Sequence, residues 1–62
     1  MTDMEKKIVE LKEQGYRKND SYEVYENAND GMTIMVYTSL WSFEEYSYTM
    51  DGRFIEVHET TL

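Results

Sequence analysis

Apolar and polar residues alternate clearly on both sides of Asp51-Gly52. An Asp-Gly pair between two alternating runs is a strong signal for a β-hairpin with a two-residue turn, which also sets the register of the strands. The predicted cross-strand pairs are Met50 with Arg53, Tyr48 with Ile55, and Tyr46 with Val57. One face of this hairpin is expected to carry Tyr46, Tyr48, Ile55 and Val57. The opposite face is expected to carry Glu45, Ser47, Thr49, Phe54, Glu56 and His58.

The first fifteen residues show the spacing of a helix. Met4, Ile8 and Leu11 follow one another at intervals of four and three, which places them on one stripe. Thr2 followed three positions later by Glu5 predicts a capping box, and Gly15 is the expected left-handed terminator. Because a helix of about 12 residues is marginal alone, its apolar stripe is expected to cover a sheet.

Two further alternating runs, residues 21–27 and 32–40, predict strands between the helix and the hairpin. Asn29-Asp30-Gly31 suits a three-residue loop with Gly31 in the left-handed conformation. Between these two runs, the expected pairs are Val24 with Val36 and Tyr22 with Thr38. A link at residues 39–43 then leads into the last hairpin, and the expected pairs there are Val36 with Tyr46 and Ile34 with Tyr48. The sequence therefore predicts one α+β domain, residues 1–62, with an N-terminal helix packed on one face of a four-stranded antiparallel β-meander (α-β-β-β-β).

The helix-side face of this sheet is expected to carry Tyr22, Val24, Ile34, Val36, Tyr46, Tyr48, Ile55 and Val57. The outer face, which the single helix leaves uncovered, is unusually aromatic. Antiparallel sheets normally present polar residues on their solvated side, whereas aromatic residues and methionine ringed by glutamates are typical of protein interfaces. The alternative is that these residues form ordinary cross-strand pairs. The candidate partner-binding residues are Glu23, Tyr25, Met35, Tyr37, Trp41, Phe43, Glu45, Phe54, Glu56 and His58.

Charge is distributed unevenly along this acidic chain. The 13 acidic and 6 basic residues give a net charge of −7. Residues 1–18 carry a net charge of +1 and residues 19–62 a net charge of −8, with Arg53 as the one base. An anionic sheet argues against direct binding of nucleic acid and favours a protein partner with a basic surface. Acidity that only maintains solubility is the alternative.

Residues capable of catalysis or metal binding are sparse. His58 is expected opposite Glu45, a pair that could orient an imidazole as a general base or could form an ordinary surface ion pair. The chain has no cysteine, and one histidine with scattered carboxylates lacks the ligand spacing of a zinc site. It also lacks a glycine-rich phosphate loop. We therefore expect a protein that is not an enzyme and that uses no metal and no cofactor.

Two functional hypotheses remain. The first is a small acidic inhibitor or regulator of a larger basic, nucleic-acid-binding protein, in which carboxylates imitate phosphates. The candidates are Asp20, Glu23, Asp30, Glu44, Glu45, Glu56 and Glu59. In size and charge the chain is similar to small acidic anti-restriction, anti-CRISPR and glycosylase-inhibitor proteins of phages, a similarity of composition without residue correspondence.

The second hypothesis is a homodimeric structural or accessory module, in which outer faces stack or edge strands pair across a two-fold axis. No apolar run reaches the roughly 20 residues that span a bilayer, and no secretory leader pattern precedes the helix. A cytoplasmic location without membrane contact is expected.

Overall fold

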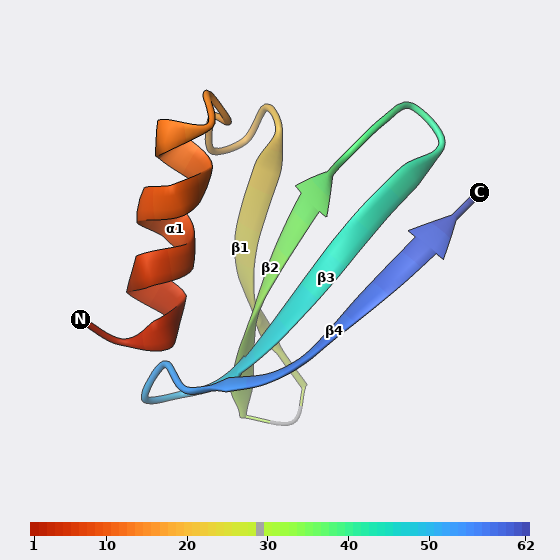
Figure 1. Ribbon diagram of the computed structural model, residues 1–62. Coiled ribbons are helices and arrows are strands. Elements are labelled where there is room, and N and C mark those ends of the chain that lie inside the picture. The colour runs from red at the N-terminus through yellow and green to blue at the C-terminus, as the bar shows by residue number, and fades with distance from the viewer. Residues whose placement is uncertain (29) are drawn as a thin grey trace.

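The computed structural model describes residues 1–28 and 30–62 and confirms the predicted α-β-β-β-β architecture (Figure 1). The elements in chain order are α1 (Asp3–Glu13), β1 (Tyr22–Asn27), β2 (Gly31–Tyr37), β3 (Ser42–Thr49) and β4 (Phe54–Thr61). The strands form one sheet in the order β1-β2-β3-β4, and each neighbouring pair is antiparallel. In Figure 1 the helix lies beside β1 and β2, while the start of β3 and the end of β4 extend away from it.

The predicted helix signals are confirmed at both ends of α1. The Glu5 amide donates to Thr2 Oγ1 at 3.1 Å, and the Thr2 amide donates to Glu5 Oε1 at 2.9 Å, which completes the capping box. Gly15 adopts a φ of 90°, the left-handed conformation expected of a residue that follows a helix.

The N-terminus of α1 is joined to the turn between β3 and β4. The Met4 amide donates to the Gly52 carbonyl at 3.0 Å, and the Phe54 amide donates to Asp3 Oδ2 at 3.0 Å. These bonds fix the helix over the sheet at this end.

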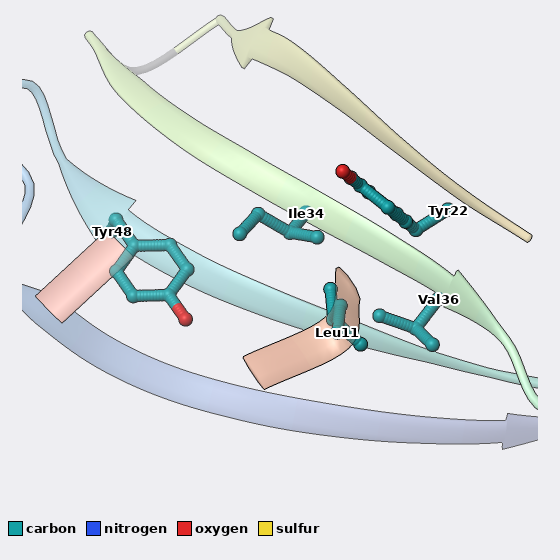
Figure 2. Packing of buried hydrophobic residues seen from close by; sticks show 5 residues of the cluster. All are labelled: Leu11, Tyr22, Ile34, Val36 and Tyr48. Atoms are coloured by element: carbon teal, nitrogen blue, oxygen red, sulfur yellow. The ribbon is translucent and has the colours of Figure 1, made fainter. Parts of the chain in front are cut away.

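Figure 2 shows the core, in which α1 and the first three strands meet. Five side chains are at most 2% exposed: Leu11, Tyr22, Ile34, Val36 and Tyr48. Met4, Ile8, Tyr16, Val24, Met32 and Tyr46 pack against them and are partly buried. The apolar stripe of the helix therefore covers the sheet as predicted, but β4 contributes nothing to the fully buried cluster.

The register of the first hairpin differs from the prediction by two residues. Tyr22 pairs with Val36 rather than with Thr38, because Asn27 and Gly31 already face each other and the loop covers residues 28–30. The residue in the left-handed conformation is Asp30, with φ 56°, rather than Gly31. The remaining member of the predicted loop triplet, Asn29, lies outside the described residues.

Gly31 is constrained by a close backbone approach rather than by its φ angle. A Cβ atom there would lie 2.8 Å from the Tyr48 carbonyl oxygen. Aspartate tolerates the left-handed conformation better than most residues, so Asp30 can close the loop while Gly31 enters the strand.

The link between β2 and β3 is also shorter than predicted, because Ser42 and Phe43 already belong to β3. The Thr38 amide donates to the Ser42 carbonyl at 3.1 Å, and the two hydroxyl oxygens are 2.8 Å apart. As a result, Ile34 pairs with Tyr46 rather than with Tyr48. This shift is again by two residues, so every side chain keeps its predicted face.

The last hairpin has a three-residue loop and a β-bulge in place of the predicted two-residue turn. The Thr49 amide donates to the Arg53 carbonyl at 2.8 Å, which leaves residues 50–52 as the loop. Tyr48 then pairs with Phe54, and the register shifts between Ser47 and Tyr48 so that Tyr46 pairs with Val57 as predicted. Because one extra residue is inserted, a single-residue slip occurs at the start of β4.

The predicted faces of Phe54 and Ile55 are wrong, because the bulge exchanges them. The ring of Phe54 meets that of Tyr48 edge to face, with centroids 5.8 Å apart, on the helix side of the sheet. Ile55 instead lines a hollow beside Ser47 and Glu56, which belong to the outer face.

Candidate interaction surface

The outer face is the side of the sheet opposite α1, and strand alternation places eight of the ten predicted partner-binding residues on it. They are Glu23, Tyr25, Met35, Tyr37, Phe43, Glu45, Glu56 and His58. One row runs Glu23, Met35, Glu45 and His58, with Met35 where Tyr37 was predicted. The next row runs Tyr25, Thr33, Ser47 and Glu56, and Tyr37 pairs with Phe43 farther along.

The other two predicted residues lie elsewhere. Phe54 lies on the helix side because of the bulge. Trp41 lies in the turn between β2 and β3 and is 67% exposed, so it covers neither the outer face nor the core.

Sequence reasoning missed several exposed apolar residues at the β4 side of the molecule. Ile55 and Val57 are 56% and 47% exposed, and Leu40 and Leu62 lie at the same end of the sheet as Trp41. The adjacent apolar pair Phe54-Ile55 breaks the alternation of the strand, and this break was the signal available for the bulge.

Neighbouring side chains cover part of the outer face. Tyr25 and Tyr37 are 38% and 40% exposed, whereas Met35 and Phe43 are half-buried. Thr33, at the centre, is buried. The aromatic residues therefore stabilise the sheet through cross-strand contacts and still present substantial area to solvent.

A hydrogen bond crosses the outer face from β1 to β3. The Tyr25 hydroxyl donates to Glu45 Oε2 at 3.2 Å, spanning the intervening strand β2. Burial, followed by the charge of Glu45, raises the pKa of the Tyr25 hydroxyl above its ordinary value of 10.0, so the group stays protonated, and able to donate, to a higher pH than a free tyrosine. This bond holds one carboxylate in a defined position on the face.

The possible general-base pair does not form. His58 lies opposite Glu45 in the register, as predicted, but its Nε2 atom contacts Glu56 Oε1 on its own strand at 3.1 Å. Both side chains of this contact are well exposed, which makes it a weak surface pair. Within residues 1–28 and 30–62, no group of three or more histidine, aspartate or glutamate side chains is arranged to hold a metal ion.

Two open hollows lie on opposite sides of the sheet. One, of about 230 Å³, lies between α1 and the β3–β4 hairpin and includes Lys7, Tyr46 and Phe54. There the Lys7 ammonium sits 4.2 Å from the centre of the Tyr46 ring, a cation–π contact. The other, of about 310 Å³, lies at the hairpin end of the outer face and includes Ile55 and Glu56.

The charges of the fold are segregated by element. The four strands contain no lysine or arginine, and their six glutamates are Glu23, Glu26, Glu44, Glu45, Glu56 and Glu59. The lysines and arginines lie on α1, in the segment after it, and at Arg53, directly after the last hairpin loop. Glu44 and Glu59 face each other directly across β3 and β4, an unfavourable pairing of like charges.

Comparison with protein-family models, curated proteins and solved structures gave no match. Evidence about function therefore comes from the sheet itself. In the described part of the chain, no helix is long and apolar enough to cross a membrane.

Proposed function

We propose that this protein is a small, non-enzymatic, acidic binding module that docks through its outer face on a larger protein with a basic surface. The observation that carries the proposal is the composition of the sheet: no lysine or arginine, three of its six glutamates (Glu23, Glu45 and Glu56) on the outer face, and exposed tyrosines beside them. In its sharpest form, the partner is a nucleic-acid-binding protein whose phosphate-binding cleft receives these carboxylates. Such a partner places the protein in the cytoplasm.

The arrangement of the charges supports this proposal. Glu23 on β1 and Glu45 on β3 lie on either side of Met35 on β2. They are therefore roughly two strand spacings, or about 10 Å, apart. Charges at this separation act together on a partner because it is close to the Debye length at physiological salt. Tyr25 and Tyr37, in the neighbouring rows, supply the amphipathic contact area that binding sites favour.

The test is capture of partners from a bacterial lysate by the immobilised protein at several salt concentrations. The diagnostic variant carries Glu23→Gln and Glu45→Gln, which keeps side-chain size and the acceptor for Tyr25. The matched control carries Glu10→Gln and Glu13→Gln, which remove the same kind of charge from the helix. If the protein is a phosphate mimic, the immobilised protein should capture a basic nucleic-acid-binding protein, and duplex DNA should displace it. The outer-face variant should fail to capture this partner, whereas the control should still capture it.

Failure to recover any basic nucleic-acid-binding protein contradicts the mimicry. Binding that is indifferent both to salt and to the outer-face substitutions contradicts the docking surface itself, because an electrostatic interface must weaken when its charges are screened or removed.

A further inference from the structure

The free edge of β4 is the second feature of the molecule that points to a partner. The Leu62 amide donates to the Trp41 carbonyl, so this pair is hydrogen-bonded across β3 and β4. Hydrogen-bonded and non-hydrogen-bonded pairs alternate along an antiparallel ladder. The even-numbered residues 56, 58 and 60 therefore bond to β3, while the backbone groups of Val57, Glu59 and Thr61 point away from the sheet.

The opposite edge of the sheet is protected by the chain itself. The Asn19 amide donates to the Tyr22 carbonyl at 2.7 Å, and the Tyr22 amide donates to the Arg17 carbonyl at 3.3 Å. These bonds come from the loop after α1 and occupy part of the free side of β1. In the described part of the chain, β4 has one such contact, the bond from the Phe54 amide to Asp3 Oδ2 at its first residue, and its only strand neighbour is β3. From Val57 onward, no described residue outside the sheet bonds to the outward backbone groups of the strand.

β4 also lacks the features that usually protect an edge strand. Exposed edges are commonly blocked by lysine, proline or very short length. β4 has eight residues, contains neither lysine nor proline, and exposes Ile55 and Val57. Its bulge lies at the start of the strand, so the segment from residue 56 onward has a regular ladder.

We propose that β4 pairs with β4 of a second copy of this chain, antiparallel across a two-fold axis centred on Val57. Such pairing joins the two sheets into one of eight strands. It does not depend on the basic partner proposed above, because its backbone hydrogen bonds use the edge of the sheet; Glu56 and His58 are the two outer-face residues that it shares with that proposal.

The register follows from the ladder and the charges. From residue 56 onward only odd-numbered residues offer free backbone groups, so odd must pair with odd and the axis must pass through a residue position. Centring on Glu56 or on Glu59 sets two like carboxylates directly against each other. Centring on His58 sets two imidazoles face to face and pairs Glu56 with Thr60, so neither residue gains an opposite charge. Centring on Val57 pairs the two valines and sets Glu56 of each copy opposite His58 of the other.

The Val57-centred register is therefore favoured by complementary side chains. The two Glu56–His58 pairs fall at non-hydrogen-bonded positions, where opposing side chains approach most closely. They lie on the outer face, next to the Glu56–His58 contact that each copy already makes within its own strand.

The first measurement is sedimentation of the full chain over a concentration series, in which the mass is expected to rise from 7.5 kDa toward twice that value. Amide hydrogen exchange of Val57 and Glu59 should slow as concentration rises. The His58 amide, bonded to β3, should be protected at every concentration. A chain that stays monomeric up to its solubility limit overturns the proposal.

Matched proline variants test whether the edge is the interface. Val57→Pro removes an outward amide at the centre of the register and should abolish the dimer. Thr61→Pro removes an outward amide beyond the paired residues and should leave the dimer intact. Proline is tolerated on an edge strand where the missing N–H faces solvent, and circular dichroism of each variant verifies the fold. Dimerisation unaffected by Val57→Pro in a folded protein contradicts edge pairing.

Charge variants test the register without depending on proline. His58→Lys should tighten the dimer and His58→Glu should weaken it, each by about 2-fold to 30-fold, because two symmetric pairs change at once. A His58-centred register gives the opposite result for His58→Lys, since two lysines would then oppose each other. Residue 60 faces Phe54 of the other copy in the proposed register, so Thr60→Lys should have little effect on the dimer. In the His58-centred register residue 60 faces Glu56, so the same substitution would tighten the dimer. Either reversed result refutes the Val57-centred pairing.

Discussion

Replacement of Gly52 by alanine should destabilise the fold much more than the same replacement at Gly15. The two glycines have nearly identical φ angles, 89° at Gly52 and 90° at Gly15. An L-residue in this left-handed region carries a penalty of about 1–2 kcal/mol, partly offset because alanine restricts the unfolded chain. These two contributions are common to both sites, so Gly15→Ala serves as the matched control.

The sites differ in what an added Cβ atom would meet. At Gly15 nothing lies within 4 Å, whereas at Gly52 the new atom would lie 2.6 Å from Thr2 Cβ. To relieve this clash, the hairpin loop and the N-terminus of α1 must separate, which weakens the hydrogen bond from Met4 to Gly52 and the bond from Phe54 to Asp3. We expect about 1 kcal/mol for Gly15→Ala and about 2–4 kcal/mol for Gly52→Ala.

Urea unfolding followed by far-ultraviolet circular dichroism measures both values. A domain of 62 residues is expected to have a free energy of unfolding of about 3 to 9 kcal/mol, so the Gly52 variant should lose a large fraction of it. Equal losses in the two variants would refute the reasoning, because the close approach of the helix would then contribute nothing.

Two further substitutions test the helix cap and the core. Thr2→Ala should lower the free energy of unfolding by about 1 kcal/mol through loss of the N-cap. The Thr2 backbone amide, followed by the Thr2 side chain, holds the pKa of Glu5 below its ordinary value, so Thr2→Ala should raise this folded-state pKa only in part, through loss of the side-chain contribution. An NMR titration in which the Glu5 pKa rises fully to its ordinary value contradicts a bond from the backbone amide. Burial raises the pKa of Tyr48 to about 12 from an ordinary value of 10.0, so its contribution to stability is complete below pH 10 and is lost as pH rises toward 12. In the Tyr48→Phe variant, the urea midpoint should decrease less between pH 10 and pH 12 than it does in the original protein. An equal decrease in both proteins would show that ionisation of Tyr48 is not the cause.

Much of the fold is predictable because its signals are local. The spacing of Thr2 and Glu5 specifies the cap, and the apolar stripe of α1 requires a sheet to cover. Short links leave consecutive strands little choice but to lie side by side, which gives the meander. The face of most sheet residues is also predictable, because two of the register errors are shifts of two residues, and a side chain keeps its face under such a shift.

The details of the loops are not predictable from the same signals. A glycine in a turn motif can be required for a left-handed φ angle, as at Gly52, or for a close backbone contact, as at Gly31, and sequence alone does not separate the two. The outcome depends on atoms from distant segments: the Tyr48 carbonyl at one site and Thr2 at the other.

In the candidate site, only the residues next to the last hairpin loop were predicted on the wrong face. Strand alternation places Tyr25, Glu45 and their neighbours correctly, while the three-residue loop and its bulge move Phe54 to the helix side. That β4 is an edge strand follows from the predicted strand order. The exposure of Val57, in contrast, depends on the position of the helix over the sheet, which the sequence does not specify.

The bond from the Phe54 amide to Asp3 joins residues 51 positions apart in the chain. During synthesis on the ribosome, α1 emerges first but cannot reach its final position until the last hairpin has been made. The hairpins that form earlier shorten the loop that remains to be closed, but they cannot supply Gly52 or Phe54, which make the contacts with the start of α1. Newly made chains should therefore expose the apolar stripe of α1 to chaperones until almost the whole sequence has left the exit tunnel.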